Sequence, residues 1–234
     1  MPLASRPKWE DHFLGLVLDP RYRIVLGATS QDATKNPVVK LCQGSSQSDP
    51  NSIGGRVTLQ TGTAIQANCY LRFGEASGSS SWSAPQDARN WTVKRNAVGE
   101  SRVVYGTNTY LQTSVGFVGY NDPQNFCEFY YDSRDVATTW RIAACLNGQH
   151  SFIDTGVTHQ PGEWLILRVQ TNYCDGTPTV EAYINDALVA TITDSSKIPL
   201  DGMAWEWNIY NFPLNGRFSN SAMWIDWLYL SQDL

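Results

Sequence analysis

Hydrophobic and polar positions alternate over short runs along most of this chain of 234 residues, and Gly, Asn, Asp, Ser or Pro separates the runs. Alternation with a period of two places every second side chain on one face, which is typical of strands with one buried face. The 3.6-residue spacing of an amphipathic helix is almost absent. The predicted strands are residues 21–26, 55–60, 65–73, 91–94, 100–104, 111–120, 125–131, 139–146, 151–153, 164–171, 179–185, 188–193, 204–210 and 224–230.

The most regular part of the pattern lies between residues 162 and 232. GEWLILRVQ predicts a long strand, TVEAYINDALVATIT a hairpin, and WIDWLYL a closing strand. The hairpin turns at Asn185-Asp186, and both residue types tolerate the positive φ that a tight turn needs. Many short strands at regular spacing predict an all-β fold, a sandwich of two antiparallel sheets. We expect a single domain at residues 9–234 that follows a short arm at residues 1–8, because no repeat or linker interrupts the pattern.

Composition agrees with strands, since the chain has 9 Trp and 11 Tyr, and aromatic residues fit a pleated surface. Most of the tryptophans that alternate in the C-terminal strands are predicted to pack between the sheets; these are Trp205, Trp207, Trp224 and Trp227. The 17 basic and 22 acidic residues give a net charge of −5 without a basic stripe, so nucleic acid is not expected as a partner. We expect neither a signal peptide nor a membrane segment, since no apolar run approaches about 18 residues.

The five cysteines are widely spaced and form no CxxC pair, which argues against a zinc cluster. Their odd number argues against a secreted disulfide framework. We therefore expect free, mostly buried thiols in a reducing cytosol. A bridge between neighbouring strands, for instance Cys127 to Cys145, stays open at this point.

Several segments carry a family resemblance. WEDHFLGLVLDPRYRIVLG resembles the opening of concanavalin A-like lectin/glucanase domains, and GGRVTLQTG with ANCYLRFG resembles their next hairpin. The C-terminal series from DTGVTHQPGEWLILRVQ to WIDWLYL resembles the laminin G-like half of the same superfamily. The resemblance covers almost the whole chain and implies a jelly-roll β-sandwich. It does not select a function, because this architecture serves hydrolases, lyases, lectins and structural shells.

A narrower likeness concerns GFVGYNDPQNFCEFYYD and WRIAACLNGQHSFIDTGV. Their residue pattern resembles that of concanavalin A-like domains of bacteriophage virion proteins. This likeness implies a non-enzymatic structural protein of the virion, in capsid decoration or in tail and adhesion, that is assembled in the host cytoplasm. Its expected partners are other virion proteins or further copies of itself in a homo-oligomer, and host-surface polysaccharide.

Catalytic motifs of the superfamily are missing. Glucanases that the chain resembles carry Glu-x-Asp-x-x-Glu on one strand, where period two aims the carboxylates into one groove. Neither this motif nor the lyase motifs Arg-Thr-Glu-Leu-Arg and Gln-Ile-His occur here. The histidines His12, His150 and His159 are interpreted as solvated or locally bonded. We predict no catalytic residue. A lyase or glycosidase in the concave-face groove is the alternative, and a stand-alone carbohydrate-binding module is the second alternative.

One constellation supports sugar binding. Period two puts aromatic, acidic and basic residues on common faces of four strands, and such a mixture suits a sugar groove if the strands are neighbours in the concave sheet. The candidate glycan-binding residues are Tyr70, Arg72, Glu128, Tyr130, Glu181, Tyr183, Glu206 and Tyr210. The other interpretation is ordinary cross-strand pairing, in which Arg72 balances Glu128 or Glu181.

Calcium is the one cofactor that the resemblance suggests, although none is required. Lectin and laminin G-like members often hold one structural calcium with Asp, Asn and backbone oxygens. Asp226 lies between Ile225 and Trp227, where a buried Asp must be paired, hydrogen-bonded or metal-bound. Members of the family that the chain resembles commonly have such an Asp near the Asp-x-Phe segment of the first strand, so the resemblance implies Asp11 and Asp226 as the metal candidates. A melting temperature that falls in EDTA would support this site, and an unchanged one would oppose it.

Overall fold

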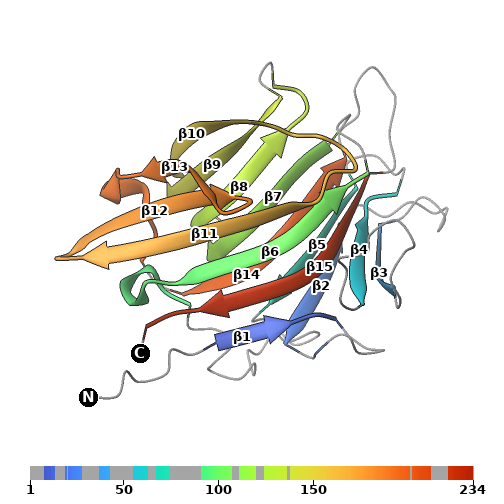
Figure 1. Ribbon diagram of the computed structural model, residues 1–234, viewed down its shortest axis with the longest axis horizontal. Helices are drawn as coiled ribbons and strands as arrows, with labels where there is room; N and C mark the ends of the chain where they lie inside the picture. Colours follow the sequence, from blue (N-terminus) through green and yellow to red (C-terminus); the bar gives the residue numbers. More distant parts are fainter. Residues whose placement is uncertain are drawn as a thin grey trace.

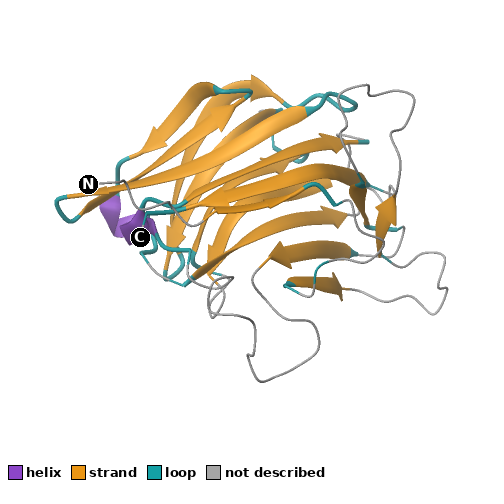
Figure 2. Cartoon of the chain, turned by 60° about the horizontal axis from the view of Figure 1, so that its bottom comes forward, coloured by secondary structure: helices purple, strands orange, loops and turns teal. Residues whose placement is uncertain are grey.

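A computed structural model describes most of the chain. The described residues are 8–13, 19, 21–27, 37–42, 55–62, 67–73, 91–106, 111–119, 124–135, 138–200, 202–211 and 221–233. They form two antiparallel sheets packed face to face, with sheet A in front of sheet B in Figure 1 and the layers visible from a second side in Figure 2. The expected all-β sandwich is therefore confirmed.

Sheet A has eight strands and sheet B has seven. The order in sheet A is β13 (Ala187–Ile192), β12 (Thr177–Ile184), β11 (Leu165–Cys174), β6 (Val98–Tyr105), β15 (Ala222–Ser231), β4 (Arg56–Gln60) and β3 (Val38–Cys42), and β1 (Lys8–Asp11) also pairs with β15. The order in sheet B is β10 (Gln149–Thr158), β9 (Thr139–Leu146), β8 (Phe126–Asp132), β7 (Leu111–Gly119), β14 (Met203–Asn211), β5 (Asn68–Phe73) and β2 (Tyr22–Gly27). Two 3-10 turns, η2 (Val93–Arg95) and η3 (Ser195–Lys197), accompany the strands in the described part of the chain.

The core lies between the sheets and is built on tryptophans of β14. Trp205 packs so closely on β6 that a Cβ at Gly99 would lie 2.1 Å from its Cζ3, so only glycine fits there. Trp207 is fully buried, and its Nε1 donates to Ser101 Oγ across the two sheets at 3.0 Å. The prediction of core tryptophans is thus confirmed for these two residues.

Trp224 and Trp227 differ from that prediction, because both are half-buried and stand apart from the core. The pairing of β15 with β6 shifts register between Ile225 and Trp227, so one extra residue, Asp226, is inserted there. A one-residue insertion moves the following side chains to the other face of the strand. Trp227 consequently pairs with Arg102 on the outer face of sheet A, and Leu228 returns to the core.

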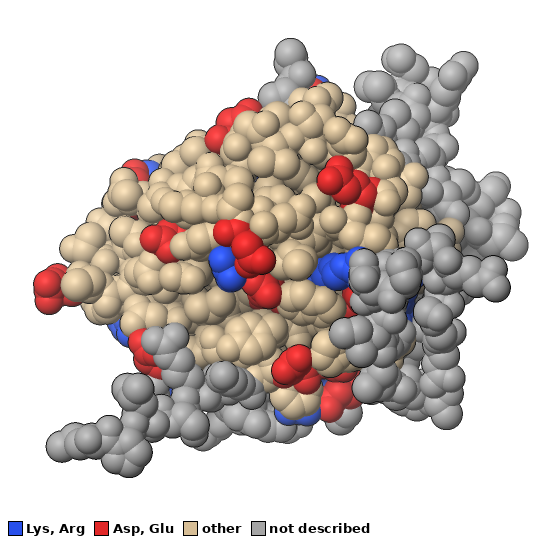
Figure 3. Space-filling model, viewed as in Figure 1, with Lys and Arg blue, Asp and Glu red and all other residues tan. Residues whose placement is uncertain are grey.

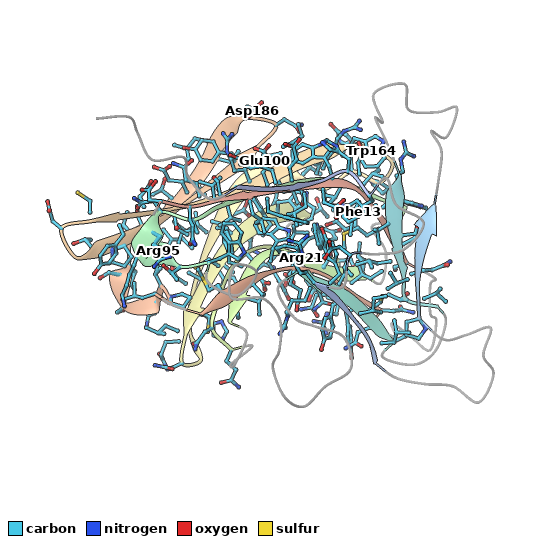
Figure 4. All side chains as sticks on the ribbon, turned by 90° about the horizontal axis from the view of Figure 1, so that it is seen from below. Phe13, Arg21, Arg95, Glu100, Trp164 and Asp186 are labelled. Atoms are coloured by element: carbon cyan, nitrogen blue, oxygen red, sulfur yellow. The ribbon has the colours of Figure 1, made fainter. Side chains whose placement is uncertain are left out.

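The first strand, β1, contacts both sheets at the edge of the core. Trp9 of β1 stacks on Phe73 of β5 with ring centroids 5.1 Å apart, and the Arg21 guanidinium lies 3.4 Å from the centroid of Trp9. Phe13, which follows β1, lies between the two layers in Figure 4 and contacts Tyr22 and Trp207. Residues 1–7 of the predicted arm lie outside the described residues.

Cys69, Cys127, Cys145 and Cys174 are not in disulfide bonds, and the first three are buried. Cys127 faces the core, whereas Cys145 pairs with Phe126 on the outer face of sheet B. A bridge between Cys127 and Cys145 would have to cross the sheet, which explains its absence. In the part of the chain that the structure describes, no helix has the length and hydrophobicity needed to cross a membrane.

His159 is neither solvated nor locally bonded through its side chain, contrary to its interpretation from sequence. It is 2% exposed, and neither ring nitrogen has a hydrogen-bond partner. Its ring stacks on Tyr131 with centroids 4.2 Å apart, and Tyr105 and Trp140 close the surrounding aromatic box. Burial lowers the pKa of His159 from 6.5 to about 4, so the folded protein holds the neutral imidazole at neutral pH.

We expect the variant His159→Phe to lose less stability in acid than the wild-type protein. The unfolded chain protonates this histidine below pH 6.5, whereas the folded chain does so only near pH 4. The stabilisation is therefore complete above pH 6.5 and is lost as the pH falls to 4, by about 3 kcal/mol for a shift of this size. Urea unfolding of both proteins across this range measures the difference, and parallel pH profiles would contradict the assignment.

Candidate functional site

The outer face of sheet B carries a row of polar residues that runs across the strands. The register places Arg72 of β5 beside Glu206 of β14, and Glu206 beside Gly116 of β7. Gly116 in turn lies beside Glu128 of β8. These four residues, the central row, come from strands distant in sequence and are brought together only by the pairing of the sheet.

Arg72 and Glu206 form a buried ion pair. Arg72 Nη2 lies 2.6 Å and Nε 2.7 Å from Glu206 Oε2, and both residues are buried. The guanidinium also lies 5.5 Å from the centroid of the Tyr70 ring, where a cation is attracted by the aromatic face. Charge-assisted hydrogen bonds of this kind offset the cost of removing two charges from water, provided that both partners are present.

Glu128 differs from Glu206 in its protonation. It is 9% exposed, and its pKa is raised from 4.5 to about 8 by burial and then by the charge of Glu206. A hydrogen bond with the Ser114 side chain and the charge of Arg72 act in the opposite direction. Glu128 therefore carries a proton at neutral pH while Glu206 is ion-paired. Two carboxyl groups in one row thus have different charge states because their surroundings differ.

Gly116 separates the two carboxyl groups. A Cβ at this position would lie 2.5 Å from the Cys127 carbonyl oxygen and 2.5 Å from Glu128 Cα, so a larger residue would force β7 and β8 apart. With strands about 4.8 Å apart, the backbones of β14 and β8, which flank β7, lie about 10 Å apart.

An aromatic shelf adjoins the central row on the side of β10, and consists of Phe126, Tyr130, His150 and Phe152. The rings of His150 and Phe152 stack with centroids 5.5 Å apart, and Tyr130 lies 6.0 Å from Phe152. Phe152 is 48% exposed, which is unusual for a large apolar side chain on a sheet. The shelf thus offers an aromatic face to solvent beside a protonated carboxyl group.

Six of the eight residues predicted to bind glycans lie on the outer face of sheet B, namely Tyr70, Arg72, Glu128, Tyr130, Glu206 and Tyr210. Glu181 and Tyr183 do not join them, because they lie on β12 of sheet A. Period two identifies the residues that share a face of one strand, but it does not identify the sheet. Arg72 balances Glu206, rather than Glu128 or Glu181 as the pairing interpretation expected.

Sequence reasoning did not single out Gly116 or Phe152. The alternation of His150 with Phe152 in QHSFID was the signal for the shelf, since both side chains fall on one face. Gly116 left no such signal, because its role depends on how β7 pairs with strands on either side.

The metal candidates are held by protein groups. Asp226 is buried, and its Oδ2 lies 2.6 Å from Arg102 Nη1, so its charge has a partner without a metal. Asp11 Oδ1 accepts a hydrogen bond from the Phe13 amide. No group of three or more His, Cys, Asp or Glu residues is gathered as a metal site within the described residues. The structural calcium stays a prediction.

Comparison with known proteins supports the fold. No family model matches this chain, and no curated protein sequence matches it. The laminarinase catalytic domain of Thermotoga maritima is 14% identical with a TM-score of 0.56, and the match covers 97% of both chains. The carbohydrate recognition domain of Emp47p is 13% identical with a TM-score of 0.51, over 87% of this chain and 92% of that domain.

A further match is botulinum neurotoxin type C, whose cell entry depends on two ganglioside molecules. It is 13% identical with a TM-score of 0.51, and the match covers 86% of this chain but only 44% of the toxin chain. This chain therefore spans less than half the length of that protein. At such identities the likeness shows the fold alone, and it confirms the expected concanavalin A-like jelly roll.

Proposed function

We propose that this protein binds carbohydrate along the outer face of sheet B. The observation that carries the proposal is the exposed aromatic shelf beside the buried central row. A sugar presents apolar C–H faces, which stack on aromatic rings, and hydroxyl groups, which need donors and acceptors in fixed positions. Arg72 supplies donors, and Glu206 supplies acceptors. A protonated Glu128 supplies both, because a neutral carboxyl group donates through its O–H and accepts through its carbonyl.

The fold supports this proposal without selecting a ligand. Glucanase domains and a carbohydrate recognition domain share the architecture. The central row and the shelf together extend from β5 to β10, six adjacent strands of sheet B. Strands about 4.8 Å apart make this face more than 20 Å wide, which accommodates several sugar units in a row.

We expect Phe152→Ala to weaken glycan binding about fivefold, because the lost stacking on an exposed ring is worth roughly 1 kcal/mol. Leu188→Ala is the matched control, since Leu188 is a 55% exposed apolar residue on β13 of sheet A. A glycan array identifies the ligand, and calorimetry of the wild-type and variant proteins measures affinity. A wild-type protein that binds no glycan, or two variants of equal affinity, would contradict the proposal.

Glycoside hydrolysis is the second candidate, and the different charge states of Glu128 and Glu206 favour it. Hydrolysis requires one protonated carboxyl group that donates to the leaving oxygen and one carboxylate that acts as base or nucleophile. Here the two groups would come from β8 and β14 rather than from a single strand. Release of reducing ends from a polysaccharide panel tests this activity, and a panel without turnover leaves binding as the function.

The virion role that the sequence pattern suggests stays a prediction, because similarity of fold to the known structures does not test it. We expect such a protein to assemble with copies of itself or with other particle components. Electron microscopy of the purified protein and of candidate particles tests this role. A polysaccharide lyase would instead release unsaturated uronates from the same panel.

A further inference from the structure

The outer face of sheet A faces the viewer in Figure 3, where a few charged groups stand among uncharged residues. Where β11 ends and β6 begins, a pocket of about 370 Å³ opens beside η2, at the left end of the sandwich in Figure 1. Its lining residues are Asn96, Val98, Gln170, Thr171, Asn172, Tyr173 and Cys174. The volume lies within the range of small-molecule sites.

One wall of this pocket is rigid. Asn96 follows η2 in the left-handed conformation, with φ of 51°, near Arg95, which is labelled in Figure 4. Its side chain holds two parts of the chain: Oδ1 accepts from the Tyr173 amide at 2.7 Å, and Nδ2 donates to Asp233 Oδ2 at 2.6 Å. The wall is therefore already positioned before any ligand arrives, which lowers the entropic cost of binding.

The floor presents unused hydrogen-bonding atoms. Gln170 Nε2 donates to Asn172 Oδ1 at 3.4 Å and to Glu181 Oε2 at 3.2 Å, and the Tyr183 hydroxyl donates to the same carboxylate oxygen at 2.8 Å. These bonds fix the two amides side by side. Among the described residues, Gln170 Oε1 and Asn172 Nδ2 have no protein partner. Gln170 thus offers one acceptor and Asn172 one donor in a pocket of small-molecule size.

We propose that this pocket is a second carbohydrate site that takes a neutral saccharide. Adjacent hydroxyl groups of a sugar can donate to Gln170 Oε1 and accept from Asn172 Nδ2, as the amides require. The lining contains no Lys or Arg, and Glu181 adjoins it, so an anionic ligand would meet repulsion rather than a partner. The site lies on the opposite sheet from the central row, so it does not depend on the function proposed for sheet B.

Cys174 allows the pocket to be tested directly. It lines the pocket and is exposed, whereas Cys69, Cys127 and Cys145 are buried. The rate at which iodoacetamide alkylates Cys174, followed by mass spectrometry of its peptide, reports only on this pocket. With a panel of neutral mono- and disaccharides, we expect at least one sugar to slow the alkylation in a saturable manner.

The variants Gln170→Ala and Asn172→Ala should each raise the saccharide concentration that gives half protection about tenfold, because each removes one ligand hydrogen bond. Phe152→Ala on sheet B should leave the protection unchanged, which separates this site from the first. Alkylation that no saccharide slows, or protection that is equal in the wild-type protein and in both amide variants, would overturn the proposal.

Discussion

Above pH 8, the variant Glu128→Gln is expected to be more stable than the wild-type protein by about 5 kcal/mol. The buried carboxyl group of Glu128 has a pKa of about 8, whereas an unfolded glutamate has one of 4.5. Between these values the folded protein retains a proton that the unfolded chain has released. The stability that this proton provides is complete below pH 4.5 and is lost as the pH rises through 8. Glutamine has no such proton to lose.

The way in which the stability difference between the two proteins changes with pH distinguishes this cause from a general effect of the substitution. The two unfolding free energies should approach each other near pH 4.5, diverge between pH 4.5 and 8, and keep a constant difference above pH 8. Urea unfolding at a series of pH values measures both curves. Glu181→Gln is the matched control, because its carboxylate lies on sheet A and is shared by Gln170 and Tyr183. A difference that does not change with pH would refute the buried, protonated state of Glu128.

The same variant separates the two candidate functions. An amide resembles a protonated carboxyl group in shape, and both donate and accept hydrogen bonds, so glycan binding should survive in Glu128→Gln. An amide cannot deliver a proton to a leaving oxygen, so hydrolysis should fall by at least a hundredfold. Equal turnover by the two proteins would remove Glu128 from the catalytic hypothesis, whereas binding would be unaffected by that result.

The faces of the strands were predictable from sequence, and the partners of the strands were not. Alternation placed Glu128 with Tyr130, and Tyr70 with Arg72, because period two is a local property of an extended chain. The ion pair between Arg72 and Glu206 depends on the pairing of β5 with β14, which are more than 100 residues apart. The same limit explains Glu181 and Tyr183, which share a face with each other but occupy the other sheet.

Strands with few buried residues were also hard to predict. β10 extends over Gln149–Thr158, whereas only residues 151–153 carried a strand signal, because it is an edge strand with exposed and half-buried positions. β1 and β3 escaped prediction, and both are short. Alternation reports burial of one face, so it weakens where a strand has little to bury.

The variant Arg72→Met is expected to lower the free energy of unfolding at neutral pH by about 3–5 kcal/mol, the usual cost of leaving one charge of a buried pair without its partner. Methionine fills much of the same volume but donates no hydrogen bond, so the Glu206 carboxylate would remain buried beside Glu128. Arg134→Met is the matched control. Arg134 pairs with Asp132 on the same sheet, but its side chain is 48% exposed, and such pairs contribute about 1 kcal/mol or less.

The double variant Arg72→Met with Glu206→Gln shows whether the loss comes from the ion pair itself. Neutralising Glu206 removes the carboxylate that Arg72 balances, so the double variant should regain most of the stability lost in Arg72→Met, with a coupling energy of about 2 kcal/mol or more in the cycle. Glycan binding of the double variant should stay weak, because its central row no longer presents a guanidinium. Additive effects of the two substitutions would mean that Arg72 and Glu206 contribute to stability independently. They would contradict the interpretation of the central row as one coupled polar group.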